Sequence, residues 1–250
     1  MIVPTLIDSG TRNVAGTTFL TNSINVNAGD ILYLVISANK SATPTICRPP
    51  ISVTGLGATW KIKTGGWQNA PIQSGLLTTS VWIAQIPANT SGVITISFTT
   101  AGSFPNYNLL TWGTIKFSDT DITDGANSSF GQCWLGGLVT SSSTTINHPM
   151  GPFANQDSYL IASFGFLRSF AGTQTCSPEA GWNELLDISI DGLDGLGGNY
   201  SNTLHIQGRS GITDNTVIST QSLGYNAYHC IQIEVIPNAA TPQITGQILL

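Results

Sequence analysis

The sequence predicts an all-β protein built as an antiparallel sandwich or barrel. Short apolar and β-branched runs recur along the chain between clusters of Gly, Asn, Pro and Ser. Helical periodicity is almost absent, and its strongest candidate, residues 181–188, is short. Only 8% of residues are charged, against a typical fraction of about 25%. Ser, Thr, Asn and Gly therefore replace the Lys and Glu that favour helices.

Strands are predicted along most of the chain, without interleaved helices. They lie near residues 2–7, 17–26, 30–38, 51–54, 58–63, 77–86, 92–99, 108–118, 138–147, 157–166, 183–190, 200–208, 215–223 and 226–236. Many short strands at this spacing favour an antiparallel sandwich or barrel over an α/β fold.

The stretch 27–38, "NAGDILYLVISA", begins with a small polar turn and continues with six apolar residues from Ile31 to Ile36. The run is too short for a membrane helix, which needs about 20 apolar residues. Its glycine precedes the strand, whereas a phosphate-binding loop needs glycines after a strand. We therefore expect a core strand buried from more than one side, with Asp30 stabilising the turn.

Other strands alternate apolar and polar residues with a period of two. The apolar sets that share a face are Ile94, Ile96 and Phe98 and, near the C-terminus, Ile231, Ile233 and Val235. Gln232 and Glu234 lie on the opposite face, which the pattern predicts to be solvated or lightly packed.

The two halves of the chain resemble each other in the order of their motifs. The matching pairs are Asp30 with Asp157, Trp60 with Trp182, Val93 with Val217, and Tyr107-Asn108 with Tyr225-Asn226. This order predicts one β-sandwich over residues 1–236, made of pseudo-repeats at about 17–119 and 138–236. The boundary is expected near 119–137, and residues 237–250 are expected to form an extended C-terminal arm.

Charge and hydropathy exclude some partners. Eight Lys and Arg residues stand against thirteen Asp and Glu, a net charge of −5, and no basic cluster is present to neutralise phosphates. We therefore expect no nucleic-acid partner. No membrane segment or export signal is evident, so we expect a soluble protein made in the cytosol. A neutral Ser/Thr/Asn-rich surface suits contact with other proteins or with sugars.

The four cysteines, Cys47, Cys133, Cys176 and Cys230, are widely spaced. They form neither a zinc knuckle nor a CxxC motif, so we expect buried reduced thiols. One or two disulfides remain an alternative if the protein functions outside a cell.

The three histidines suggest no catalytic pair. His148 starts a loop, and His205 sits in an alternating strand. His229 adjoins Cys230, but alternation places the two side chains on opposite faces. No GxSxG or HExxH motif is present. The sequence therefore predicts no catalytic residue, no cofactor and no metal site.

Acidic residues offer alternatives to that prediction. Calcium could bind the loop 191–199, with Asp191 and Asp194, or the cluster Asp119, Asp121 and Asp124. The same cluster, or Glu179 with Glu184, could supply the carboxylates of a glycosidase. For the cluster of Asp119, Asp121 and Asp124 the preferred interpretation is turn capping by solvated carboxylates, and for 191–199 it is a flexible surface loop.

Contact residues are expected in loops and at the chain ends. Trp60 and Trp182 match between the halves and are assigned to the core, whereas Trp67 and Trp134 lie in Gly-rich stretches expected to be loops. Apolar residues at both chain ends need a covering partner. The candidate interface residues are Ile2, Val3, Trp67, Trp134, Ile244, Ile248, Leu249 and Leu250.

The segments "NSINVNAGDILYLVISA", "GATWKIKTGG", "TTSVWIAQIPANTSGVITISFTT" and "LLTWGTIKFSDTDITDG" together resemble β-rich virion proteins of tailed bacteriophages. In the second half, "NQDSYLIASFGF", "PEAGWNELL" and "HCIQIEVIP" resemble the same scheme, so the likeness covers roughly residues 17–236. The resemblance implies a jelly-roll-like β-sandwich with a structural role and brings no catalytic residues.

The function implied by this resemblance is that of a capsid decoration (cement) protein in the virion. Its expected partner is the major capsid protein, and it would form a homo-oligomer, for which a trimer is one option. Two alternatives remain open. The first is a carbohydrate-binding module of a tail fibre or receptor-binding protein, and the second is a glycan-cleaving jelly-roll enzyme.

Overall fold

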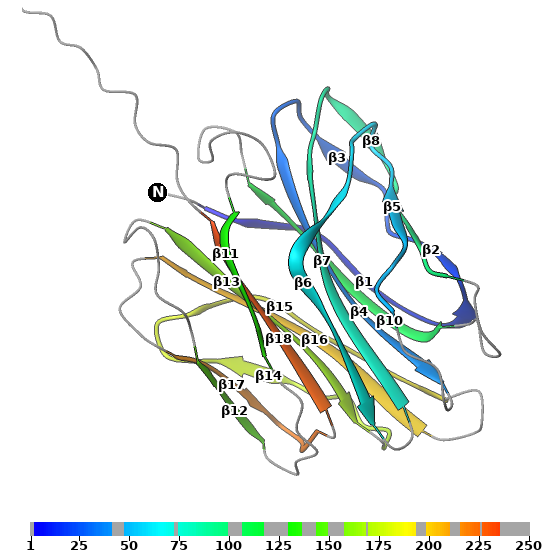
Figure 1. The fold of residues 1–250 in the computed structure, drawn as a ribbon, viewed down its shortest axis with the longest axis vertical. Coiled ribbons are helices and arrows are strands. Elements are labelled where there is room, and N and C mark those ends of the chain that lie inside the picture. The colour runs from blue at the N-terminus through cyan, green and yellow to red at the C-terminus, as the bar shows by residue number, and fades with distance from the viewer. Residues whose placement is uncertain are drawn as a thin grey trace, which may run out of the picture.

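The computed structural model describes residues 3–41, 48–72, 75–99, 107–117, 130–136, 144–149, 158–168, 170–193, 199–210, 216–225 and 227–235. This part of the chain is all-β and antiparallel, as the sequence predicts (Figure 1). It contains no helix, and hence none with the length and apolar character needed to cross a membrane. The C-terminal arm expected at 237–250 lies outside the described residues.

The first half forms one large sheet and two small ones. The large sheet has the order β1 (Thr5–Gly16), β10 (Tyr107–Phe117), β4 (Ile31–Ser41), β7 (Gly75–Gln85) and β6 (Lys61–Ile72). One small sheet has the order β2 (Thr18–Leu20), β9 (Thr95–Ser97) and β5 (Ser52–Thr54), and the other pairs β3 (Ile24–Val26) with β8 (Thr90–Gly92). The small sheets cover one face of the large sheet, which therefore has a core on that side.

The second half repeats this arrangement. Its large sheet has the order β11 (Phe130–Gly136), β18 (Ala227–Val235), β13 (Tyr159–Arg168), β16 (Asn199–Ser210) and β15 (Asn183–Leu193). Its small sheet has the order β12 (Thr145–Pro149), β17 (Thr216–Gln221) and β14 (Cys176–Pro178). The large sheets correspond strand by strand, and so do the three-stranded sheets. In each half the first strand lies beside the last, as in a jelly roll.

The matching strand order is what a duplicated unit would produce. It also extends the predicted repeats, because β1 and β11 begin before residues 17 and 138. The segment 119–137 was expected as a boundary, yet it contains β11. Trp60 and Trp182 are both buried, as predicted, and each immediately precedes an equivalent strand, β6 or β15.

The two large sheets pack face to face between the small sheets, which lie on opposite sides of the molecule (Figure 1). The core between the large sheets, called the central core below, draws on both halves. Its buried members are Ile31, Tyr33, Val35, Val81, Ile83, Ile115, Phe117, Tyr159, Ile161, Leu186, Leu204, Ile206, Ile231, Ile233 and Val235.

Contacts between the large sheets follow an approximate two-fold rule. Strand β1 lies against β15, and their counterparts β11 and β6 also lie against each other. In the same way, β10 contacts β16 while β18 contacts β7. This reciprocal pattern is the one seen when two copies of a subunit meet across a two-fold axis.

Strand β4 confirms the prediction for the stretch 27–38. Residues 31–36 are all fully buried, with alternate side chains in the central core and in the core under the small sheets. The backbone N–H of Asn27 donates to Asp30 Oδ2 at 2.8 Å, so Asp30 closes the preceding turn as expected. Lys116 Nζ lies 3.6 Å from the same carboxylate oxygen.

The prediction that Gln232 and Glu234 lie on a solvated or lightly packed face is wrong. Both side chains are fully buried, because the small sheet of the second half and the residue before β13 cover that face of β18. Gln232 Nε2 donates to the Pro149 carbonyl at 3.3 Å, and Ser158 Oγ donates to Glu234 Oε1 at 2.7 Å. Hydrogen bonding lets these polar groups occupy a buried face.

The assignment of Trp67 and Trp134 to loops is also wrong. Trp67 lies in edge strand β6, opposite Ser80, and Trp134 lies in edge strand β11, opposite Gln232. Both strands have a register shift just before the tryptophan, in stretches that contain glycine. Glycine is common at such bulges, so a Gly-rich stretch can still belong to a strand.

Glycine at Gly165 lets the two large sheets approach closely. A Cβ there would overlap Thr79 Oγ1 and lie 2.8 Å from Ser37 Oγ, both on the facing sheet. We expect Gly165→Ala to lower the free energy of unfolding by about 1–3 kcal/mol, the usual cost of overpacking a core. A Cβ at Gly16 would make an ordinary 3.5 Å contact with Phe19. Denaturant titration should find Gly16→Ala near wild type, and equal losses in the two variants would contradict the close approach.

His229 makes the fold sensitive to acid. Its side chain is fully buried opposite Gly165, both ring nitrogens lack a hydrogen-bond partner, and burial lowers its pKa from 6.5 to about 3. Below about pH 6.5 only the unfolded chain takes up this proton readily, so stability falls with pH by up to about 1.4 kcal/mol per pH unit. This loss of stability is nearly absent above about pH 6.5 and stops growing below about pH 3, where the folded protein also takes up the proton.

Between pH 6.5 and pH 4.5, we expect the free energy of unfolding of His229→Leu to fall by about 2–3 kcal/mol less than that of wild type. Urea denaturation at a series of pH values gives the slope of unfolding free energy against pH for both proteins. Burial also lowers the pKa of His205, which stays in both proteins and cancels in the comparison. Parallel slopes would contradict a neutral, buried His229.

Candidate functional site

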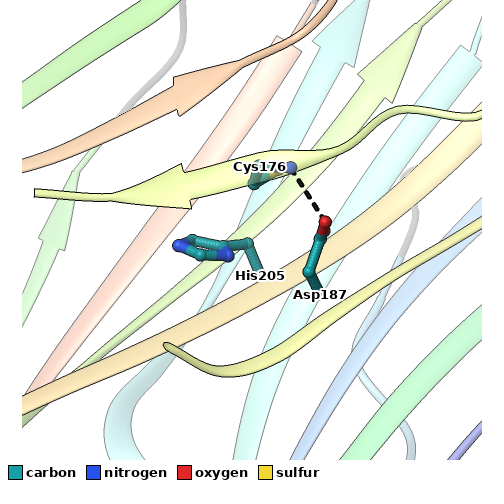
Figure 2. Close-up of side chains that lie close together, drawn as sticks. All are labelled: Cys176, Asp187 and His205. Carbon is teal, nitrogen blue, oxygen red and sulfur yellow. Dashed lines mark hydrogen bonds between the residues drawn. The ribbon is translucent and has the colours of Figure 1, made fainter. Parts of the chain in front are cut away.

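One cluster of chemically capable side chains stands out among the described residues. Cys176 on β14, Asp187 on β15 and His205 on β16 each place one candidate ligand atom within 4.8 Å of the other two. Figure 2 shows the three side chains converging between a strand of the small sheet and two strands of the large sheet. We call this group the Cys-Asp-His cluster.

Strand pairing explains how residues distant in sequence meet. Asp187 and His205 are directly opposite each other in the β15–β16 register, so their side chains share one face. The covering strand β14 adds Cys176, whose backbone N–H donates to Asp187 Oδ2 at 2.9 Å (Figure 2). Asp187 therefore both belongs to the cluster and fixes the position of β14.

Burial controls the protonation of the cluster. Cys176 and His205 are buried, and Asp187 is half-buried. Burial raises the pKa of the Cys176 thiol, and the charges of Asp187 and Glu184 raise it further. Burial lowers the pKa of His205 to about 4 and raises the pKa of Asp187. At neutral pH the cluster therefore contains a thiol and a neutral imidazole.

This chemistry disfavours a catalytic cysteine. A nucleophilic cysteine needs a lowered thiol pKa and access to a substrate, whereas Cys176 has a raised pKa and is 5% exposed. A thiol, an imidazole and a carboxylate at short distances are instead a typical donor set for a transition metal.

The cluster lies in a polar row on the covered face of β16. Ser201, Thr203, His205 and Gln207 occupy alternate positions there and are all buried. Ser189 Oγ lies 2.9 Å from Thr203 Oγ1, which donates to Gln174 Oε1 at 3.3 Å. Most of the row is thus hydrogen-bonded within the protein. His205 Nδ1 and Asp187 Oδ1 are buried without a hydrogen-bond partner.

Most candidate interface residues at the chain ends fall outside the described part. Val3 is described and is 61% exposed, which fits a contact role. For Trp67 and Trp134, only the strand positions given above are described. Outside the described residues lie Ile2, Ile244, Ile248, Leu249, Leu250, Asp119, Asp121, Asp124, Asp194 and Cys47.

The described acidic candidates stabilise the fold. Asp191 belongs to strand β15, and its Oδ2 accepts a hydrogen bond from the Gly172 backbone N–H at 3.0 Å. Glu179 Oε2 accepts from the Ile218 backbone N–H at 3.2 Å. The surface loop expected at 191–199 is shorter than predicted, because residues 191–193 belong to β15 and Asn199 begins β16. Cys176 and Cys230 are buried and form no disulfide, as expected.

Sequence reasoning missed the Cys-Asp-His cluster. Its members share no motif spacing, and they meet only because β14 is laid across β15 and β16. A partial signal was present: alternation over 201–207 places Ser201, Thr203, His205 and Gln207 on one face. Without the covering sheet, that face reads as exposed.

The small sheets expose a second notable feature, two uncharged outer faces. In the first half, the rows across β2, β9 and β5 contain Thr18, Ser97 and Ser52, then Leu20, Thr95 and Thr54. Thr18, Leu20 and Thr54 are exposed, and the other three are partly buried. In the second half, the rows across β12, β17 and β14 contain Thr145, Thr220, Ser177, Asn147, Ile218, Pro149 and Thr216. Ile218 and Thr216 are partly buried, and the others are exposed. Every strand side chain in these rows is uncharged, although one charged group borders each face: Arg12 donates to the Leu20 carbonyl at 3.0 Å, and Glu179 accepts from the Ile218 backbone N–H at 3.2 Å.

Comparison with known proteins yields no relative: no protein-family model, no curated protein and no solved structure matches the chain. The resemblance to phage virion proteins stays a prediction from the sequence segments quoted above.

Asp187 should contribute to stability through its hydrogen bond to β14. Asp187→Ala removes the acceptor of the Cys176 backbone N–H, so we expect a loss of about 1–3 kcal/mol in unfolding free energy. Glu184, which is exposed on the same strand, provides the control. Chemical denaturation should find Glu184→Ala near wild type, and an unchanged Asp187→Ala would contradict the structural role of this carboxylate.

Proposed function

We propose that the protein is a non-enzymatic structural component of a tailed-bacteriophage virion. More specifically, we propose a capsid decoration protein that binds the major capsid protein and stabilises the head shell. The sequence likeness to virion proteins suggests the setting, and the physical features of the fold support a binding role.

The arrangement of the two uncharged faces carries this proposal. They lie on small sheets at opposite sides of the molecule, separated by the two large sheets (Figure 1). A protein of this form can contact two neighbouring subunits at once and join them. Flat rows of Thr and Ser supply hydrogen-bonding groups for a polar interface without the cost of burying charge.

The interior also fits a structural role better than catalysis. The large sheets are covered on both faces, and the Cys-Asp-His cluster is enclosed beneath β14. Cys176 and His205 are buried there, so a substrate would have little access to them. Binding through outer surfaces requires no such access.

The direct test is to locate the protein on particles. We expect it to co-sediment with purified virions of the phage that encodes it, at a constant ratio to the major capsid protein across a density gradient. Quantitative mass spectrometry gives the ratio, and immunogold labelling locates the protein on heads. Its absence from the particles would contradict the proposal, and labelling confined to tails would favour the fibre alternative.

A surface variant tests the binding face. Leu20 is exposed in one row of the first uncharged face, and Leu20→Glu would place a carboxylate against a partner. We expect at least about tenfold weaker binding to heads from phage lacking the protein. Val14 is an equally apolar exposed residue on β1, and Val14→Glu is the control. Equal binding by Leu20→Glu and wild type would exclude this face as the contact.

A further inference from the structure

We propose that Cys176, Asp187 and His205 form a binding site for a zinc-class divalent ion. The site would join the covering strand β14 to the large sheet of the second half. This inference does not depend on the proposed virion role, and either one can fail without the other.

The donor types favour zinc over calcium or magnesium. Zinc combines thiolate sulfur, imidazole nitrogen and carboxylate oxygen in its protein sites, whereas calcium and magnesium prefer oxygen ligands. Two donor atoms, His205 Nδ1 and Asp187 Oδ1, are buried without a hydrogen bond of good geometry. The Cys176 thiol interacts with the Asp187 carboxylate, and the Leu186 backbone with the His205 ring; a bound ion would replace the thiol contact. Buried polar atoms normally have a bonding partner, and a bound ion would supply one for both atoms.

The geometry is close to that of a bound ion. Around a tetrahedral zinc, neighbouring donor atoms lie about 3.3–3.6 Å apart, from bond lengths of about 2.0–2.3 Å. The three donor atoms here already lie within 4.8 Å of one another. A shift of about 1 Å, which side-chain rotation at Cys176 and Asp187 can supply, would bring the donor atoms to the spacing around zinc.

The charges of the site balance in the bound state. Zinc would replace the thiol proton of Cys176, which leaves to solvent as the sulfur–zinc bond forms. The thiolate and the Asp187 carboxylate then cancel the two positive charges of the ion, and His205 binds as neutral imidazole. Asp187 forms no ion pair within the described part of the chain, so this carboxylate has no competing cation there.

Surrounding residues hold the ligands in place. His205 Nε2 lies 3.5 Å from Gln207 Oε1, which leaves Nδ1 for the ion, and its ring lies 6.1 Å from that of Phe164. A polar partner on the second ring nitrogen is typical of histidine ligands. Glu184 stands at the exposed edge of the cluster, close enough for its charge to act on Cys176. Glu184 or a water molecule can fill the fourth position.

The test measures metal binding by the full chain under a non-chelating phosphine reductant. A chelator first strips any bound metal, and zinc is then added back. We expect elemental analysis to find one zinc per chain and the melting temperature to rise. Cobalt substitution should produce a thiolate-to-cobalt charge-transfer band together with visible ligand-field bands. Cys47→Ser/Cys133→Ser serves as the background, so that only Cys176 and Cys230 remain.

Matched variants in that background separate the site from other binding. Cys176→Ser should abolish the charge-transfer band and weaken zinc binding by more than about tenfold, and His205→Gln should weaken zinc binding similarly. Cys230→Ser, in the neighbouring core, should bind as the background protein does. Circular dichroism verifies that each variant is folded. The proposal is wrong if the background protein shows no charge-transfer band, or if folded Cys176→Ser keeps it.

Discussion

The rest of the structure depends on the packing of two five-stranded sheets against each other. Each sheet already has a covered outer face, so the central contact buries its second face and makes its middle strands fully interior. Apolar side chains from both halves fill this layer, and each one removed from water contributes about 1.5–3 kcal/mol. Glycine at Gly113 and Gly165 keeps the layer thin, because the facing sheet occupies the space of a Cβ at either position. The two jelly-roll-like units therefore behave as one folded body.

Polar contacts within this layer fix how the sheets meet. Tyr33 Oη lies 3.0 Å from Ser163 Oγ, and Ser37 Oγ donates to Asn202 Oδ1 at 3.0 Å. Apolar packing alone tolerates sliding, whereas a buried hydrogen bond is lost when the sheets shift. Together with the reciprocal contacts of β1 with β15 and β6 with β11, these bonds give a self-complementary joint between the halves. The joint leaves the small sheets on the outside, where their uncharged faces are available to partners.

The sequence predicted the features that depend on local pattern. Alternation placed Ile94, Ile96 and Phe98 in the core, and the unbroken run at 31–36 indicated a strand buried on both faces. It failed where a distant element decides the environment. Gln232 and Glu234 alternate with apolar residues as solvent-facing residues do, but another sheet covers them. The Cys-Asp-His cluster escaped for the same reason, since only the crossing of β14 brings Cys176 to Asp187 and His205.

The central claim is that both halves share one core and unfold together. Native-state hydrogen exchange along a denaturant series, read by mass spectrometry, tests this most directly. Strands β4 and β13 occupy equivalent central positions in the two halves, so their slowest amides should exchange with one common free energy, equal to that of global unfolding. If the amides of one strand exchange through an opening that leaves the other protected, the halves are independent units and the shared core does not hold the fold together.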